Sequence, residues 1–168
     1  MLKNYPINFE QLIEENKDTI YRIASSYAQS PLEPKDLFQE VLYQIWKSLP
    51  SFEGKANIKT WVYRITLNVC MRSQMKLKKI DDLTIGIDSI QFTPADHAKT
   101  ETETEKHLAL QSCIAQLKKA DQSVLILYLE DLNYKQISEI IGMTENHIAV
   151  KMKRIRKKLF DCITPKIK

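Results

Sequence analysis

The chain has 168 residues, 43% hydrophobic and 27% charged, a composition typical of a soluble globular protein. Its longest dense apolar run, VLILYL at Val124–Leu129, is far shorter than the roughly 20 residues that span a bilayer, and its amino terminus lacks the apolar segment of a secretion signal. We therefore expect a cytoplasmic protein without membrane insertion. Residues 1–78 carry a net charge of +3, residues 79–105 of −5 and residues 106–168 of +6, which indicates two modules joined by an acidic linker.

The first module begins with two predicted helices. Asn8 can cap the first helix, with Gln11 as the reciprocal partner, and apolar residues at three- and four-residue spacing continue it to just before Pro31. The second opens at Pro34 and ends before Pro50. Its apolar half comprises Leu37, Phe38, Val41, Leu42, Ile45, Trp46 and Leu49. Its other half shows Asp36, Gln39, Glu40, Tyr43 and Lys47.

A third helix is predicted over Ile58–Lys78, after the loop SFEGKAN with Gly54 near its middle. One stripe of this helix is apolar and should be buried: Ile58, Val62, Ile65 and Val69. A neighbouring stripe combines an aromatic ring, two guanidinium groups and an amide: Trp61, Arg64, Asn68 and Arg72. Taken alone, this second stripe fits a solvated helix face with one half-buried tryptophan equally well.

The residues Ile80–Glu105 form the predicted linker, which is rich in Asp, Thr and Glu, has little to bury, and should be mostly flexible. A short extended piece could lie at Ile85–Ile87. The second module then shows helical patterns over Leu108–Leu117 and Asp121–Glu130. A capping box at Asn133 and Gln136 opens the helix Tyr134–Ile141, and Gly142 ends it. Thr144 caps a last helix to Phe160, so the pattern predicts a helix-turn-helix.

The last helix has a narrow apolar stripe that should face the core: Ile148, Met152, Ile155 and Leu159. Its opposite side displays Asn146, Val150, Lys153 and Lys157, flanked by Ala149, Lys151 and Arg154. A solvated charged face is the alternative for such a helix seen alone. A membrane-surface helix needs a broader apolar face, and the major groove of A-form RNA is too narrow, so duplex DNA is the favoured ligand.

In such a complex the side chains divide by chemistry. Lys153 and Arg154 can donate hydrogen bonds to guanine, and Ala149 and Val150 can touch a thymine methyl group. The cations Lys151 and Lys157, together with His147, would hold phosphates.

The three cysteines, Cys70, Cys113 and Cys162, are far apart in sequence and form no CxxC pair. We expect three reduced and mostly buried thiols, without a disulfide or a zinc site. The three histidines are equally scattered, so no metal site is predicted.

Two segments resemble the bacterial RNA polymerase sigma factors. DLFQEVLYQIWKSLPSFEGKANIKTWVYRITLN (Asp36–Asn68) is similar to their second conserved region, and LYLEDLNYKQISEIIGMTENHIAVKMKRIRKKL (Leu127–Leu159) to their fourth. The order of the segments, the acidic linker and the length resemble the small extracytoplasmic-function (ECF) type.

The resemblance implies an all-α fold of two small helical domains, residues 1–79 and 106–168, joined by a linker over 80–105. It implies binding to core RNA polymerase, through the clamp helices of the largest subunit and the flap of the second-largest. The polymerase-binding residues would be Asp36, Gln39, Glu40, Tyr43 and Lys47. The melted −10 strand would contact Phe52, Gly54, Lys55, Asn57, Trp61, Arg64, Asn68 and Arg72. The −35 duplex would contact Asn146, His147, Ala149, Val150, Lys151, Lys153, Arg154 and Lys157.

The resemblance also implies an anti-sigma factor as a partner, and neither a cofactor, a small-molecule substrate nor a catalytic residue. Two positions depart from the family pattern. Arg72 stands where an acid is frequent, and Val150 replaces a small hydroxyl residue, so no promoter sequence is predicted.

Three other functions compete with this interpretation. A free-standing helix-turn-helix regulator would bind DNA but would have no use for the polar face at Asp36–Lys47. An enzyme would need clustered carboxylates or an activated nucleophile, whereas Glu101, Glu103 and Glu105 form a charge run in the linker. A sigma-like decoy would bind an anti-sigma factor without starting transcription.

Overall fold

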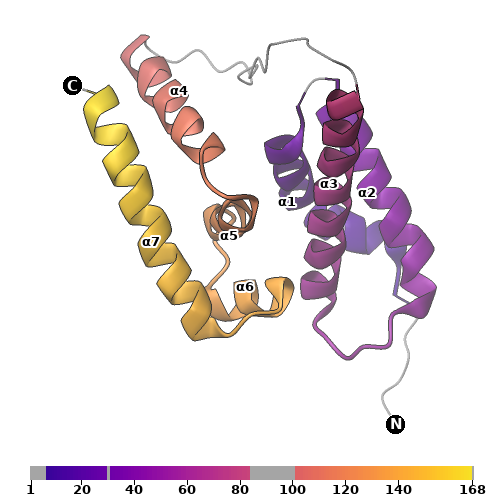
Figure 1. Ribbon diagram of the computed structural model, residues 1–168. Helices are drawn as coiled ribbons and strands as arrows, with labels where there is room; N and C mark the ends of the chain where they lie inside the picture. Colours follow the sequence, from indigo (N-terminus) through magenta and orange to yellow (C-terminus); the bar gives the residue numbers. More distant parts are fainter. Residues whose placement is uncertain (1–6, 30, 84–100, 168) are drawn as a thin grey trace. The chain divides into compact units, whose positions relative to one another are not determined.

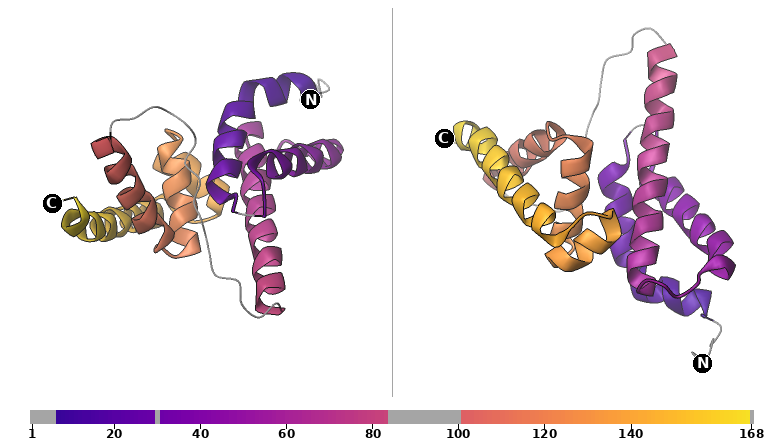
Figure 2. Two further views of the ribbon diagram at one scale, coloured as in Figure 1. Left: turned by 90° about the horizontal axis from the view of Figure 1, so that it is seen from above. Right: turned by 60° about the horizontal axis from the view of Figure 1, so that its bottom comes forward.

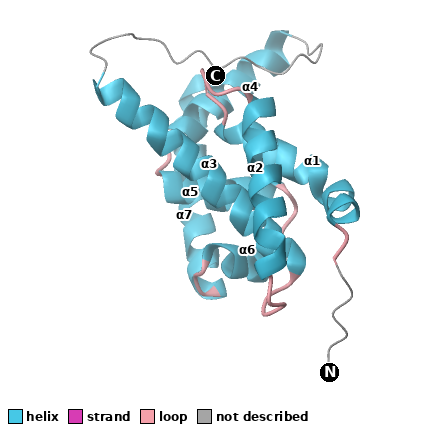
Figure 3. Ribbon diagram, turned by 90° about the vertical axis from the view of Figure 1, so that its right-hand side faces the viewer, coloured by secondary structure: helices cyan, strands magenta, loops and turns pink. Residues whose placement is uncertain are grey.

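The computed structural model describes residues 7–29, 31–83 and 101–167, and the regular structure in these segments is entirely helical (Figure 3). The chain divides into two compact units, Met1–Phe92 and Thr93–Lys168. Each unit builds its own core from helices, as the all-α prediction required.

The first unit is a bundle of α1 (Phe9–Tyr27), α2 (Pro34–Ser48) and α3 (Ile58–Leu83), in which each helix packs against the other two (Figure 1). A 3-10 turn at Leu49–Ser51 follows α2. Asn8 caps α1 by accepting a hydrogen bond from the Gln11 backbone N–H, and Pro34 stands at the first position of α2. The fully buried side chains include Ile20, Ile23, Tyr27, Leu37, Val41, Ile45 and Val62.

One buried hydrogen-bond pair joins α1 to α3 inside this bundle. The Tyr63 hydroxyl donates to Asn16 Oδ1 at 3.1 Å, and Asn16 Nδ2 donates to the Leu12 carbonyl at 2.8 Å. Asn16 is 1% exposed and Tyr63 is 7% exposed. Polar groups so deep in a core need partners, and this pair provides them between two helices.

The second unit contains α4 (Glu101–Ala115), α5 (Lys119–Leu129), α6 (Tyr134–Ile141) and α7 (Glu145–Ile163), followed by a 3-10 turn at Thr164–Lys166. The long helix α7 packs against α4, α5 and α6 (Figure 2). Three members of its predicted apolar stripe, Ile148, Met152 and Ile155, are fully buried, whereas the fourth, Leu159, is partly exposed. The three buried side chains pack in a core with Val124, Leu127 and Ile137.

The predicted helix-turn-helix is confirmed in its details. Asn133 and Gln136 form a complete capping box at the start of α6. Gly142 ends α6 with a left-handed φ of 81°, a conformation that costs glycine little because it has no Cβ. The Thr144 side chain then accepts a hydrogen bond from the His147 backbone N–H and caps α7. The turn between the two helices is therefore determined by local sequence.

The helix ends differ from the predictions in several places. Two helices extend into the predicted linker Ile80–Glu105, since α3 continues to Leu83 and α4 begins at Glu101, and α7 ends at Ile163 rather than at Phe160. The extended piece suggested at Ile85–Ile87 lies outside the described residues. Gln11 bonds Glu15 rather than closing the predicted reciprocal cap at Asn8.

The expectation of three reduced thiols is wrong. Cys113 of α4 and Cys162 of α7 form a disulfide, with their Cα atoms 5.9 Å apart. They are separated by 49 residues, so only the packing of α4 on α7 brings them within bonding distance. Cys70 of α3 remains a free, buried thiol, and its burial raises its pKa to about 12.

Candidate nucleic-acid and protein interfaces

The first candidate surface is the outer face of α2. Its five predicted residues, Asp36, Gln39, Glu40, Tyr43 and Lys47, are all exposed. The Lys47 ammonium lies 5.9 Å from the centre of the Tyr43 ring, and Glu40 accepts a hydrogen bond from Gln44. These short-range contacts lie within the helix itself and leave the face accessible to a partner.

Trp46 belongs to the same face, although the sequence analysis assigned it to the buried half of α2. Its side chain is 59% exposed, and its ring centre lies 6.3 Å from that of Tyr43. Residues three apart are neighbours on a helix surface, so the position of Trp46 relative to Tyr43 could have indicated this placement. The α2 face, as used below, comprises Asp36, Gln39, Glu40, Tyr43, Trp46 and Lys47.

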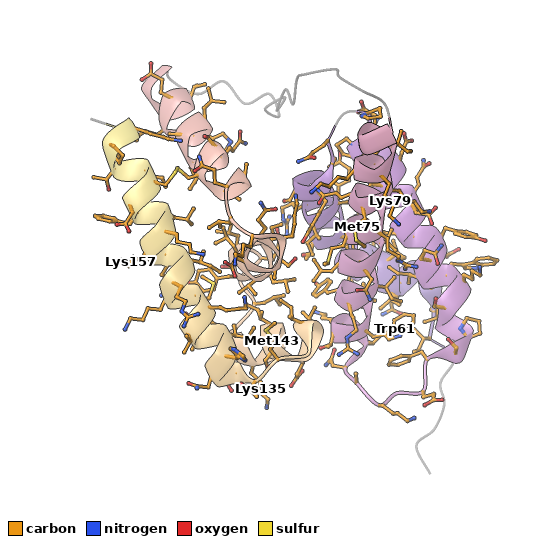
Figure 4. All side chains as sticks on the ribbon, viewed as in Figure 1. Trp61, Met75, Lys79, Lys135, Met143 and Lys157 are labelled. Atoms are coloured by element: carbon orange, nitrogen blue, oxygen red, sulfur yellow. A yellow bond between two sulfur atoms is a disulfide. The ribbon has the colours of Figure 1, made fainter. Side chains whose placement is uncertain are left out.

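The second candidate surface lies where the loop after α2 meets the start of α3. Trp61 lies near the start of α3 (Figure 4) and is half-buried. Its ring packs against that of Phe52, with the ring centres 5.1 Å apart. Gly54 has a φ of 71°, so the loop turns through a conformation that suits glycine. Lys55 forms an ion pair with Glu53. The aromatic pair therefore stands beside a tight, polar loop.

The predicted −10 residues along α3 are brought onto one exposed side. Arg64, Asn68 and Arg72 are all exposed, and the Arg72 side chain donates to the Asn68 carbonyl at 3.2 Å. Asn57 has a different position, because its side-chain oxygen accepts a hydrogen bond from the Lys59 backbone N–H at the beginning of α3. Asn57 thus helps to start the helix that carries the other residues.

The third candidate surface is the outer side of α7. Asn146, His147, Val150, Lys153, Arg154 and Lys157 are exposed, and Ala149 is partly exposed. Lys157 lies on the side of α7 that points away from α5 (Figure 4). The cap at Thr144 leaves the first turn of α7, with its backbone N–H groups, at the amino-terminal end of this side.

Lys151 differs from its neighbours because it is already paired inside the second unit. Its ammonium lies 2.8 Å from Asp121 Oδ1, and Lys158 lies 3.3 Å from Asp121 Oδ2. Burial alone would raise the pKa of Asp121, but the hydrogen bonds and charges of Lys151 and Lys158 outweigh it, so this pKa is lowered. Arg156 is likewise engaged, donating to the Tyr128 hydroxyl at 2.7 Å.

Comparison with known families identifies both units. Residues 12–80 match the family model for Sigma-70 region 2, and residues 107–159 match that for Sigma-70 region 4. RNA polymerase sigma factor SigV of Bacillus subtilis is 28% identical over 86% of this chain and 84% of its own length. The ECF RNA polymerase sigma factor SigW of the same organism is 24% identical over 90% of this chain and 86% of its own length.

The chain belongs to the extracytoplasmic-function sigma factors. As an RNA polymerase sigma factor of this type, it acts in transcription initiation. Its fold is similar to the sigma factor RpoE of Bartonella quintana, solved with the anti-sigma factor NepR, at a TM-score of 0.69 and 22% identity, covering 92% of this chain and 95% of that one. Across the described helices of this sigma factor, none is long and apolar enough to cross a membrane.

Proposed function

We propose that this sigma factor binds core RNA polymerase through the α2 face. The observation that carries this proposal is the exposure of Tyr43 and Trp46, 50% and 59%, beside carboxylates and a lysine. Large aromatic side chains with a polar rim are characteristic of protein interfaces, and burying them against a partner is favourable. The clamp helices of the largest polymerase subunit are the proposed partner of this face. The flap of the second-largest subunit is the proposed partner of the second unit.

The beginning of α3 and the preceding loop would hold the melted −10 strand. Base stacking on an aromatic side chain contributes about 1–3 kcal/mol per base and does not depend on sequence, whereas a base in a pocket is read by its hydrogen-bonding edge. Trp61 and Phe52 supply the aromatic surface, and the amide of Asn68 supplies both donor and acceptor. Arg64 and Arg72 would follow the backbone. Capture of the unstacked strand would in this way favour melting.

The exposed side of α7 would read the −35 element as duplex. Lys153 and Arg154 are the proposed contacts to guanine, Ala149 and Val150 those to thymine methyl groups. Asn146 and His147 in the first turn of α7, and Lys157 further along the helix, would bind backbone phosphates. The Lys151 ammonium can contact a phosphate only if its ion pair with Asp121 breaks, or if it donates hydrogen bonds to both groups at once. Its proposed contribution to DNA affinity is therefore the smallest of the lysines on this side.

Two further features belong to the same proposal. An anti-sigma factor is a proposed partner, supported by the similar sigma factor RpoE, which was solved in complex with the anti-sigma factor NepR. A cytoplasmic location is proposed because polymerase and promoter DNA are there. The chain would act by binding alone, with polymerase supplying the catalysis.

The deciding experiment is capture of purified core polymerase by two matched variants. Gln39→Ala/Glu40→Ala removes two neighbouring exposed residues from the α2 face, whereas Glu10→Ala/Gln11→Ala removes the same two residue types from the exposed side of α1. We expect the first variant to lose polymerase and the second to keep it. Equal capture of both would contradict the assignment of the α2 face. Promoter-specific run-off transcripts from the unchanged chain would separate a sigma factor from a free-standing regulator or a decoy.

A further inference from the structure

The disulfide between Cys113 and Cys162 fastens the first helix of the second unit to its last. Among the α4 side chains that the structure describes, Thr104 to Ala115, Cys113 alone is buried. Leu108 and Leu110 are 44% and 36% exposed, so the apolar contribution of α4 to the core is small. The disulfide therefore adds a covalent link to a contact between α4 and α7 that buries few α4 side chains completely.

The polar links of α4 to the rest of the unit are concentrated near the same end. Lys166, just after α7, donates to the Ser112 hydroxyl at 3.0 Å, and Gln122 of α5 donates to the Ile114 and Ala115 carbonyls. These links hold the carboxyl-terminal turn of α4.

The part of α7 that carries the proposed DNA-reading residues is held in place by other contacts. Ile148, Met152 and Ile155 are fully buried and α7 packs against α5 and α6, so this part of α7 has an apolar anchor besides α4. Cys162 lies near the other end of α7, two residues after Phe160, which is 70% exposed. Breaking the disulfide would thus detach α4 first. Because the second unit is small, losing this link would lower its stability and reduce the fraction of molecules in which the DNA-reading residues are folded.

The two cysteine residues differ in exposure. Cys113 is 2% exposed, whereas Cys162 is partly exposed. An external thiolate can therefore attack the Cys162 sulfur, forming a mixed disulfide and releasing Cys113 as a thiolate that takes a proton. A second external thiol then displaces the first, which leaves two protein thiols and one low-molecular-weight disulfide. The reverse sequence, with that disulfide as the oxidant, restores the bond.

We propose that Cys113 and Cys162 form a reversible thiol–disulfide switch that controls whether the second unit is competent to bind the −35 duplex. This rests on the proposed function, since it assigns a regulation to the same DNA-reading helix. A disulfide in a DNA-binding protein of a reducing compartment is usually transient or redox-sensing. This favours a switch over a permanent structural cross-link. Oxidation fastens α4 and stabilises the unit; reduction releases α4 and lowers the folded fraction.

The test begins with hydrogen-exchange mass spectrometry on the full chain, oxidised and then reduced with dithiothreitol. We expect peptides within residues 101–115 to exchange at least about tenfold faster after reduction, with peptides of α1–α3 unchanged. Cys113→Ser/Cys162→Ser should match the reduced chain under both conditions. Cys70→Ala, which removes the thiol outside the disulfide, should respond as the unchanged chain does. Equal protection of α4 in the two redox states would overturn the switch, whatever the outcome with DNA.

A second arm measures DNA binding with polymerase. The oxidised chain with core polymerase is used to enrich duplexes from a random-sequence pool, and the enriched pool is the probe for both redox states. We expect reduction to weaken its binding by at least about tenfold, while the α2 face in the first unit still captures polymerase. If the oxidised holoenzyme enriches a sequence and both redox states then bind it equally well, the switch is refuted but the proposed function is not. Failure of the oxidised holoenzyme to enrich any sequence would refute the proposed function, and the switch that depends on it.

Discussion

Replacing Tyr63 with phenylalanine removes a single hydroxyl from the contact between α1 and α3. That hydroxyl donates to Asn16 Oδ1 at 3.1 Å, and Asn16 is 1% exposed, so water cannot easily take the vacant place. An acceptor left unsatisfied in a core costs about 1–3 kcal/mol. For a unit of this size, 1 kcal/mol lowers the melting temperature by roughly 4–8 °C. We therefore expect Tyr63→Phe to lower the melting temperature of the first unit by at least about 4 °C.

The double variant Tyr63→Phe/Asn16→Leu tests the physical reason for this loss. It removes both polar partners and fills the site with an apolar side chain of similar size, so it should be more stable than Tyr63→Phe alone. Hydrogen exchange in peptides from α1 and α3 measures the free energy of opening, with α5–α7 peptides as an internal reference. Tyr21→Phe, at an exposed position on α1, should change little. A double variant less stable than Tyr63→Phe would refute the reasoning.

Three further predictions concern charges and pH. Lys157→Ala should weaken binding to all duplexes and reduce the slope of log affinity against log salt concentration by about one unit. Arg154→Ala should instead relax specificity at one −35 position. If both variants lost equal affinity for enriched and random duplexes, this division of roles would be contradicted. Because the pKa of Asp121 is lowered in the folded chain, its carboxylate stabilises the second unit above about pH 4 and loses this effect as the pH falls below that. Asp121→Asn should therefore lower stability by about 1 kcal/mol at pH 7 in urea unfolding, and a difference that persists at pH 2 would argue against the ion pair as its source. Burial raises the pKa of Cys70 to about 12, so the folded chain keeps a proton that the unfolded chain loses, and stability should fall between about pH 9 and 12. Cys70→Ala should show a shallower decline over that range in the same measurement, and an equal decline would rule out Cys70 as the cause.

Local signals in the sequence were sufficient for most of the fold. Pro34, the capping box at Asn133 and the glycine at 142 each act within a few residues of their own position, so the helix boundaries they set could be read directly. The buried stripe of α7 followed from spacing alone, because period 3.6 places Ile148 and Met152 on the same side. The exposed side of α7 followed in turn, as the complement of that stripe.

The features that the sequence did not predict involve residues that contact distant parts of the chain, or a residue at the edge of a helix face. The bond between Cys113 and Cys162 depends on how α4 packs on α7, which no local pattern encodes. The pairing of Lys151 with Asp121 spans two helices in the same way. Trp46 lies at the border between the two sides of α2, where hydrophobicity alone favoured burial but geometry gave exposure.

The positions of the two tryptophans, Trp46 on α2 and Trp61 on α3, have a practical consequence. One indole stands at the surface proposed for polymerase and the other beside the loop proposed for single-stranded DNA, and this chain has no further indole. Because polymerase has indoles of its own, each single-tryptophan chain would carry a tryptophan analogue that is excited at a longer wavelength. With Trp61→Phe, the emission of the analogue at position 46 should shift to the blue when polymerase covers it. With Trp46→Phe, the analogue at position 61 should instead be quenched by stacked bases, so that loading and strand opening can be timed separately.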